Sequence, residues 1–180
     1  MGRAHWWAPA STPAAALPTE VDGASVLCVE PSVFEAAGGR QAFRDLAHAW
    51  HRQCLQDEVV SHAFSRPGQH PEHVERLAAY WAEALGGPAD YSETMADHSH
   101  VLRLHSGNGE HEEMDERAQV CFAHALDDAG LPDDERLRST LKDYFRWATL
   151  LMATHPDSAD AVPEGLKLPQ WSWTGQVQEP

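Results

Sequence analysis

The feature that most constrains this chain is an apolar repeat at spacings of three and four residues, which recurs in several segments between residues 40 and 152. In segment 40–55 it comprises Phe43, Leu46, Trp50 and Cys54. Such spacing places side chains on one face of an α-helix, where they can be buried together. A short helix is also predicted at 32–37, a loop and one short helix are predicted to cover 89–105, and the later segments with equivalent stripes span 71–85, 112–129 and 135–152. No alternating strand pattern and no internal repeat is convincing, so the sequence predicts an all-α fold.

The ends of the chain differ in composition from its helical middle. Residues 1–30 are rich in Ala and Pro and show no apolar period, which predicts a disordered N-terminal arm. Residues 31–154 form the predicted helical domain. Residues 155–180 contain several prolines and are predicted to be non-helical, although Trp171 and Trp173 suggest that this extension packs on the domain. A length of 180 residues suits one domain of this kind.

Charge and cysteine content exclude several classes of protein. The net charge of −15 argues against nucleic-acid partners and anionic membrane surfaces, because phosphate binding needs a surplus of Lys and Arg. No apolar run is long enough for a transmembrane helix, and prolines interrupt the first 20 residues, so a cytoplasmic location is expected. The three cysteines lack CxxC spacing, so we expect free thiols rather than disulfides or a zinc knuckle.

Twelve histidines are many for this length, and three of them share a face with apolar residues. His51 borders the stripe of its helix, and His73 lies four residues before Leu77. His105 follows Val101 by four residues and precedes a Gly-rich break. Each could be a metal ligand, or a hydrogen-bonded core or cap residue. His98 is interpreted as a loop or cap residue, and no zinc or di-iron motif is present.

Several stretches of the chain resemble a known family. The string AYWAEALGGPADYSE at 79–93 is similar to the end of the distal helix and the following loop in group II truncated haemoglobins. The string HSHVLRLH at 98–105 resembles the approach to the family's proximal histidine, and FEAAGGRQAF at 34–43 resembles its opening. DDAGLPDD and LPQWSW resemble actinobacterial members. The similarity extends over about residues 33–152.

The resemblance implies a truncated globin-like two-over-two helical sandwich with extended, largely irregular termini, built around haem b. His105 would be the proximal ligand of the haem iron, and axial ligation together with distal hydrogen bonding would control the iron. For each of the other pocket candidates, a purely structural role in the core is the alternative. These candidates are Trp50, Phe64, Leu77, Tyr80, Trp81, Leu102, Phe122 and Phe145.

The chain also departs from the family pattern on the distal side. His51 occupies the position where the family usually has Tyr, and His73 replaces a small residue. Ala118 occupies the position of an expected Trp, and Ser106-Gly-Asn replaces the usual Ala-Pro-Phe. The family's tyrosine–tryptophan cage for bound oxygen is therefore absent. Tight, slow-release oxygen storage is not expected.

Two distal histidines leave several functions open. His51 or His73 could donate a hydrogen bond to bound dioxygen, bind the iron as a sixth ligand, or move protons as an acid–base pair, and packing or capping is the structural alternative. We expect a globin that binds O2 or another diatomic ligand such as CO or NO, in transport or in redox chemistry. The alternative is a haem-dependent oxidative enzyme, peroxidase- or oxygenase-like, acting with peroxide on a small organic substrate. A reductase and a second copy of the chain are further candidate partners, and a haem-free interaction module is the third hypothesis.

Overall fold

The helices follow the apolar stripes closely. The computed structural model of the protein describes residues 29–65 and 69–178, and the predicted N-terminal arm lies almost entirely outside them. The helices of this part are α1 (Val33–Ala37), α2 (Gly39–Gln56), α3 (Ser61–Phe64), α4 (His73–Ala84), α5 (Asp90–Thr94), α6 (His98–His105), α7 (Glu112–Asp128) and α8 (Glu135–Met152). A 3-10 turn, η1 (Ala159–Ala161), and a two-stranded antiparallel hairpin, β1 (Trp171–Ser172) and β2 (Gly175–Gln176), follow.

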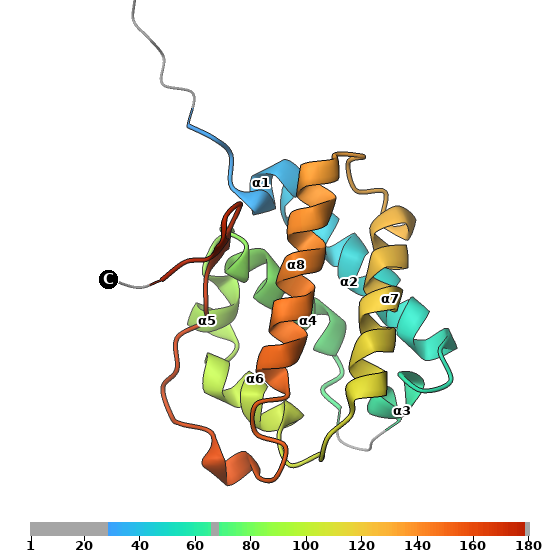
Figure 1. The fold of residues 1–180 in the computed structure, drawn as a ribbon. Coiled ribbons are helices and arrows are strands. Elements are labelled where there is room, and N and C mark those ends of the chain that lie inside the picture. Colours follow the sequence, from blue (N-terminus) through green and yellow to red (C-terminus); the bar gives the residue numbers. More distant parts are fainter. Residues whose placement is uncertain (1–28, 66–68, 179–180) are drawn as a thin grey trace, which may run out of the picture.

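Four long helices form two layers (Figure 1). Helix α2 packs on α4 in one layer, α7 packs beside α8 in the other, and α2 also contacts α7 across the interface. The apolar stripes of all four helices face one another there. The core between them includes Phe43, Leu46, Tyr144 and Phe122, each about 1% exposed. The predicted all-α, two-over-two architecture is confirmed.

Local signals in the sequence set several of the helix ends. Ser32 accepts a hydrogen bond from the backbone N–H of Glu35, and the Glu35 carboxylate accepts one from the N–H of Ser32, which completes a capping box before α1. The carboxylates of Asp97 and Asp134 cap α6 and α8 by accepting hydrogen bonds from the N–H groups of His100 and Leu137. These caps satisfy backbone donors that have no partner within the helix.

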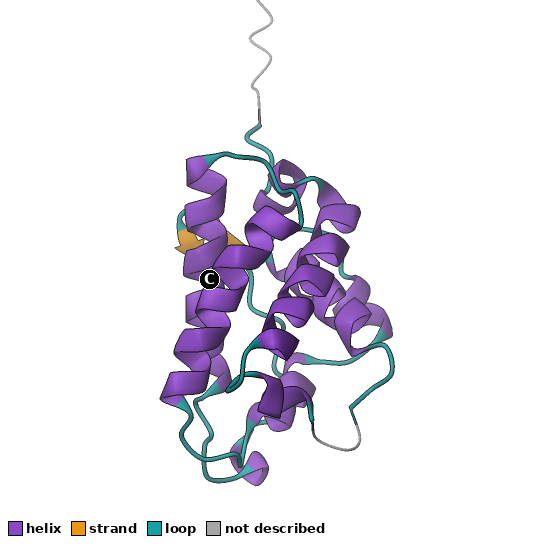
Figure 2. Cartoon of the chain, turned by 90° about the vertical axis from the view of Figure 1, so that its right-hand side faces the viewer, coloured by secondary structure: helices purple, strands orange, loops and turns teal. Residues whose placement is uncertain are grey.

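The C-terminal extension packs back on the helical body. It leaves the end of α8, passes α6 and α5, and reaches the hairpin near α1 (Figures 1 and 2). The ring of Trp171 lies 5.9 Å from that of Tyr144 and 5.1 Å from that of Trp147. The indole N–H of Trp173 donates to the carbonyl of Pro31 at 2.7 Å. The extension is thus anchored to α8 and to the residues before α1.

The structure differs from the sequence-based expectations in four short elements. Helix α3 and the hairpin are not predicted, α5 is a second helix where one short helix and a loop are expected, and the 3-10 turn η1 interrupts an extension predicted to be non-helical. These helices and strands have two to five residues each, which is too short to show an apolar period. The predicted loop after Ser65 continues into residues 66–68, which lie outside the described part. Among the described helices, none has the length and apolarity required to cross a membrane.

Candidate functional site

His105 is the last residue of α6, and its ring is held in one tautomer. Its Nδ1 lies 2.9 Å from the carbonyl oxygen of Val101, one turn earlier. Because a carbonyl can only accept a hydrogen bond, Nδ1 carries the proton and donates it. In the neutral ring, Nε2 therefore keeps its lone pair. This arrangement is typical of histidines that bind metals, whose second nitrogen donates to a carbonyl or carboxylate.

The surroundings of His105 favour its neutral form. Its pKa is lowered, chiefly because the surrounding protein desolvates the imidazole, and the hydrogen bond to Val101 only partly opposes this. The side chain is nonetheless accessible to solvent. Nearby, His111 and Asp115 pair at 2.9 Å.

His51 from α2 and His73 from α4 meet across the interface between these helices. Their Nε2 atoms are 3.1 Å apart. The Nδ1 of His73 lies 3.2 Å from the carbonyl oxygen of His70, so Nδ1 is the protonated nitrogen when His73 is neutral. His51 therefore donates from Nε2 to the lone pair of His73. The pKa of His51 is lowered by burial first, and then by the neighbouring His73 and His48.

Aromatic rings surround this histidine pair. The ring of Phe64, from α3, lies 4.9 Å from that of His51 and 6.2 Å from that of His73. The indole of Trp50 packs edge-on against Phe64 at 5.7 Å. All four side chains, and that of Leu77 on α4, remain partly accessible. Partly accessible aromatic and aliphatic side chains beside two imidazoles make a surface that a flat apolar cofactor would cover.

The remaining predicted pocket residues are more deeply buried. Trp81, Phe122 and Phe145 form one aromatic cluster with Trp50, in which the rings of Phe122 and Phe145 stack at 4.1 Å. Leu102, on α6, is 3% exposed but lies outside the main core cluster of the described residues. The aromatic cluster is therefore core in this structure. Contact of these residues with haem stays a prediction.

Tyr80 forms a buried polar contact that the sequence does not reveal. Its hydroxyl lies 2.9 Å from Nδ1 of His98, and both side chains are buried. Burial lowers the pKa of His98 and raises that of Tyr80, so both groups are neutral near pH 7. His98 begins α6, directly after its cap residue Asp97. The only signal in the sequence is that cap, because the string Asp-His-Ser-His otherwise looks solvent-exposed.

A family model described as bacterial-like globin matches residues 32–149, which is more than half of the chain. The chain belongs to the bacterial-like globin family. No curated protein sequence matches it. Membership identifies the chain as a haem-binding globin, and the two layers α2/α4 and α7/α8 are the arrangement expected for a truncated globin.

Three solved structures illustrate the similarity. The haemoglobin of the thermophilic phototroph Chloroflexus aurantiacus is 25% identical, with a TM-score of 0.58 over 68% of this chain and 98% of that protein. A thermostable haemoglobin of the actinobacterium Thermobifida fusca is 27% identical, with a TM-score of 0.56 over 70% of this chain and 99% of that protein. The group II truncated haemoglobin of Bacillus anthracis shares the fold at 21% identity, with a TM-score of 0.60 over 72% of this globin and 96% of that protein.

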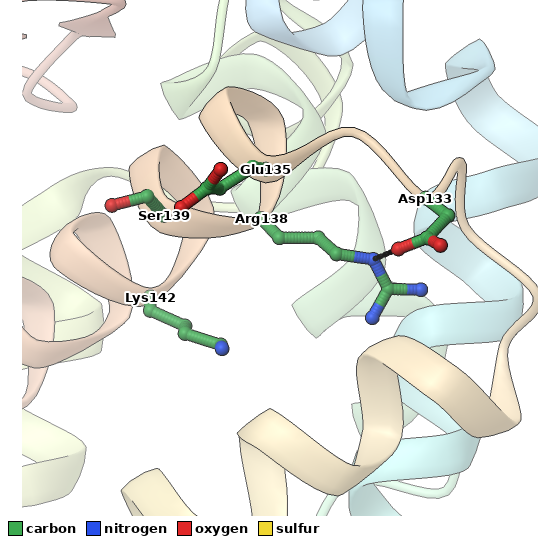
Figure 3. Close-up of a pocket in the computed structure, with 5 residues that line it drawn as sticks. All are labelled: Asp133, Glu135, Arg138, Ser139 and Lys142. Carbon is green, nitrogen blue, oxygen red and sulfur yellow. Dashed lines mark ion pairs between the residues drawn. The ribbon is translucent and has the colours of Figure 1, made fainter.

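The residues of this globin fit the cofactor that its family implies. The donor set is suitable, because His105 offers a neutral Nε2 whose opposite nitrogen is already hydrogen-bonded. A separate shallow pocket lies at the start of α8, and Asp133, Glu135, Arg138, Ser139 and Lys142 line it (Figure 3). Its lining is charged or polar and includes none of the predicted haem residues. A second pocket, between α7 and α8, is lined in part by Phe122 and Phe145, but it contains no histidine. The surfaces of α2, α4 and α6 are the candidate haem site because they carry His51, His73 and His105.

Proposed function

We propose that this globin holds haem b through Nε2 of His105 and binds dioxygen or another diatomic ligand on the side of His51 and His73. The observation that carries the proposal is the hydrogen bond from His105 Nδ1 to the Val101 carbonyl. It fixes the proton on Nδ1, so that in the neutral ring the lone pair of Nε2 points away from the helix backbone and is free to bind iron. Bound haem would supply the iron at which a diatomic ligand binds.

His51 and His73 would act on the bound ligand through hydrogen bonding. Iron-bound dioxygen carries partial negative charge, so an N–H donor stabilises it. His51 donates its Nε2 proton to His73 in this structure. We expect one of the two imidazoles to turn its N–H toward a bound ligand. The other imidazole would accept a hydrogen bond from the first or fix its orientation. A cytoplasmic location, a reductase and a homodimer stay predictions.

The test of this proposal is the absorption spectrum of the purified protein, with and without carbon monoxide. We expect a strong Soret band that shifts when carbon monoxide binds to the reduced protein. His105→Ala should weaken haem binding or change the spectrum, and added imidazole should restore the haem binding and the spectrum of the unsubstituted protein. His111→Ala removes a neighbouring histidine of α7's N-terminus and serves as the matched control. An unchanged spectrum in His105→Ala would show that another residue binds the iron.

A second candidate function, a peroxidase-like enzyme, is favoured by one observation. Two imidazoles joined at 3.1 Å can hold or release a proton between them, which suits general acid–base work on bound peroxide. In such a reaction hydrogen peroxide takes two electrons and two protons from two phenol molecules, and two water molecules and two phenoxyl radicals form. Loss of phenol oxidation in His51→Ala and His73→Ala, but not in the exposed His62→Ala, would support the enzyme. Equal rates in all variants would exclude it.

A further inference from the structure

The segment 155–168, here called the C-terminal strap, runs along the helix that carries His105. At the first turn of α6, the backbone N–H of His98 donates to the carbonyl of Leu166 at 3.2 Å. In return, the N–H of Leu166 donates to the hydroxyl of Ser99 at 2.9 Å. Ser99 is 0% exposed and Leu166 is partly buried, so these bonds are partly shielded from water.

The strap also holds the other end of the same helix. After His105 the chain turns, and the N–H of Gly107 donates to the carbonyl of His155 at 3.0 Å. The N–H of Gly109 donates to the carbonyl of Pro156, also at 3.0 Å. These two bonds join the residues just beyond His105 to the beginning of the strap. The strap therefore contacts α6 on both sides of the proposed iron ligand.

Between these two ends, the strap and the helix each contain a buried apolar residue, and an arginine of the helix bonds to the strap. Val162 of the strap and Leu102 of α6 are 4% and 3% exposed, and neither belongs to the main core cluster. The Arg103 guanidinium donates to the carbonyl of Val162 at 3.4 Å and pairs with Glu164 at 3.6 Å. A helix of eight residues is marginal without tertiary contacts. The strap supplies many of the contacts of α6.

The far end of the strap is itself anchored. Leu168 is 8% exposed and belongs to the core, and Trp171 packs on Tyr144 and Trp147 of α8. Trp173 is tied to Pro31 by its indole N–H and is covered by the guanidinium of Arg136, 4.4 Å from its ring. With α8 at one end and this anchor at the other, the strap is held at both of its ends.

We infer that the C-terminal strap is a positioning element for the proximal ligand, in which Ser99 and Val162 hold α6 so that the His105 imidazole keeps one depth and one orientation toward the iron. This inference rests on the proposed function of His105. Loss of the strap contacts would let α6 move relative to α8, and the bond from His105 to the iron would lengthen or tilt. Haem would then leave more easily.

The experiment compares two double variants of the full chain. Ser99→Ala with Val162→Ala removes a strap hydrogen bond and a buried strap side chain. Ser172→Ala with Val177→Ala makes the same two substitutions beyond the strap, where Ser172 bonds only within the hairpin and Val177 is exposed. Thermal unfolding of both variants verifies that each is folded. The loss of one or two hydrogen-bonded or packed groups should change the equilibrium between the closed and the locally opened protein about tenfold.

Three measurements follow. In the strap variant, amide hydrogen exchange at His98, Gly107 and Gly109 of the haem-free protein should be about tenfold faster. The iron–histidine stretching band, recorded by resonance Raman after photolysis of carbon monoxide, should shift or broaden. Transfer of haem to apomyoglobin should be about tenfold faster. The hairpin variant should match the unsubstituted protein in all three.

The outcomes separate this inference from the proposed function. Faster exchange with an unchanged iron–histidine band would overturn the positioning role, because α6 would then be loosened without moving the ligand. An unchanged exchange rate would show that the strap contacts do not hold α6 in place. If His105→Ala keeps the spectrum of the unsubstituted protein, the proposed function fails, whatever the exchange rates show.

Discussion

The indole N–H of Trp50 donates to the backbone carbonyl of Ala118 at 3.1 Å, and this bond joins α2 to α7. Ala118 occupies the position where the family resemblance leads one to expect a tryptophan. In this chain a tryptophan of the opposite helix reaches that position instead. The Trp50 ring also packs edge-on against Trp81 and Phe145, at 5.6 Å in each case. The Trp50 indole is therefore held beside residue 118, within the aromatic cluster.

This arrangement predicts that the two positions cannot both be large. Trp50→Ala should lower the free energy of unfolding by about 3–5 kcal/mol, because it leaves a cavity in the aromatic cluster. Ala118→Trp should lower it by about 1–3 kcal/mol, because the new ring would overlap the indole of Trp50. Urea unfolding measures both, and the exposed Val120→Ala is the control on the same helix. A neutral Ala118→Trp would show that the cluster has spare room.

The architecture could be predicted from the sequence because it rests on local periodicity. The stripe containing Phe43 and Leu46 predicts both a helix and its buried face. Of the two glycines expected to separate the first two helices, Gly38 does so and Gly39 is already the first residue of α2. The short α3 gives no such signal, since four residues hold only one turn. What packs against a helix is also absent from its own sequence, so the contacts of Trp50 with α7 could not be predicted.

In the candidate site, too, local features could be predicted from the sequence and contacts between distant segments could not. His51, His73 and His105 can be selected because each shares a face with apolar residues. His98 cannot, because its burial depends on Tyr80 of α4 and on Leu166 of the C-terminal strap, both distant in the sequence. The pairing of His51 with His73 likewise depends on the packing of α2 against α4. The iron ligand and the distal roles stay predictions until they are measured.

The distal pair should govern the release of dioxygen. His51→Ala and His73→Ala each remove one partner of the 3.1 Å hydrogen bond, and with it a donor or its orientation. We expect either change to speed dioxygen dissociation about tenfold, the effect of one charge-assisted hydrogen bond. His48→Ala, an exposed histidine that pairs with Glu75 of α4, is the control. Stopped-flow dissociation rates that are equal in all three variants would contradict a distal role.

The buried contact between Tyr80 and His98 should make stability depend on pH. The pKa of His98 is lowered from 6.5 because burial desolvates the imidazole, so the unfolded chain binds a proton that the folded chain resists. The free energy of unfolding should therefore fall as the pH drops below 6.5. The pKa values of His51 and His105 are lowered too and add to this dependence.

Urea unfolding of the haem-free protein at about pH 7.5 and pH 5 measures the effect. His98→Gln, whose amide can still bond to Tyr80, should show a smaller loss of stability at the lower pH than the unsubstituted protein. His100→Gln, on the exposed side of the same helix, should leave the loss unchanged. Equal losses in the unsubstituted protein and in His98→Gln would mean that His98 does not resist protonation.

Two glycines should respond differently to the same substitution. A Cβ added to Gly87 would lie 2.6 Å from the Ala82 carbonyl oxygen and 2.8 Å from the Phe34 ring, so backbone or ring must shift. Gly130 has a φ of +66° but nothing within 4 Å, so only the left-handed backbone disfavours a side chain. We expect Gly87→Ala to cost about 3 kcal/mol and Gly130→Ala about 1 kcal/mol in urea unfolding. A Gly87→Ala variant as stable as Gly130→Ala would show that the Ala82 backbone and the Phe34 ring can shift at little cost.

The carboxylate of Asp57 joins the end of α2 to α7 and should make the fold sensitive to acid. It accepts hydrogen bonds from the N–H groups of Val59 and Val60, both at 2.9 Å, and from Arg117, whose Nη2 lies 2.8 Å from Oδ2. These bonds, that of Arg117 first, lower the pKa of Asp57 from 3.8 to about 2. A carboxylate with a lowered pKa stabilises the fold fully above the unfolded value and loses that contribution as the pH falls toward the folded value.

Between pH 3.8 and about 2, the unsubstituted protein should therefore lose stability more steeply than Asp57→Asn, whose amide oxygen can still accept from the two N–H groups but carries no charge. Near pH 7, Asp57→Asn should be the less stable of the two, because Arg117 has lost its anionic partner. Asp133→Asn, at a fully exposed carboxylate, is the control and should follow the unsubstituted protein. Thermal unfolding across this pH range gives the slopes. Parallel curves for Asp57→Asn and the unsubstituted protein would show that the pair with Arg117 adds nothing to the stability of the globin.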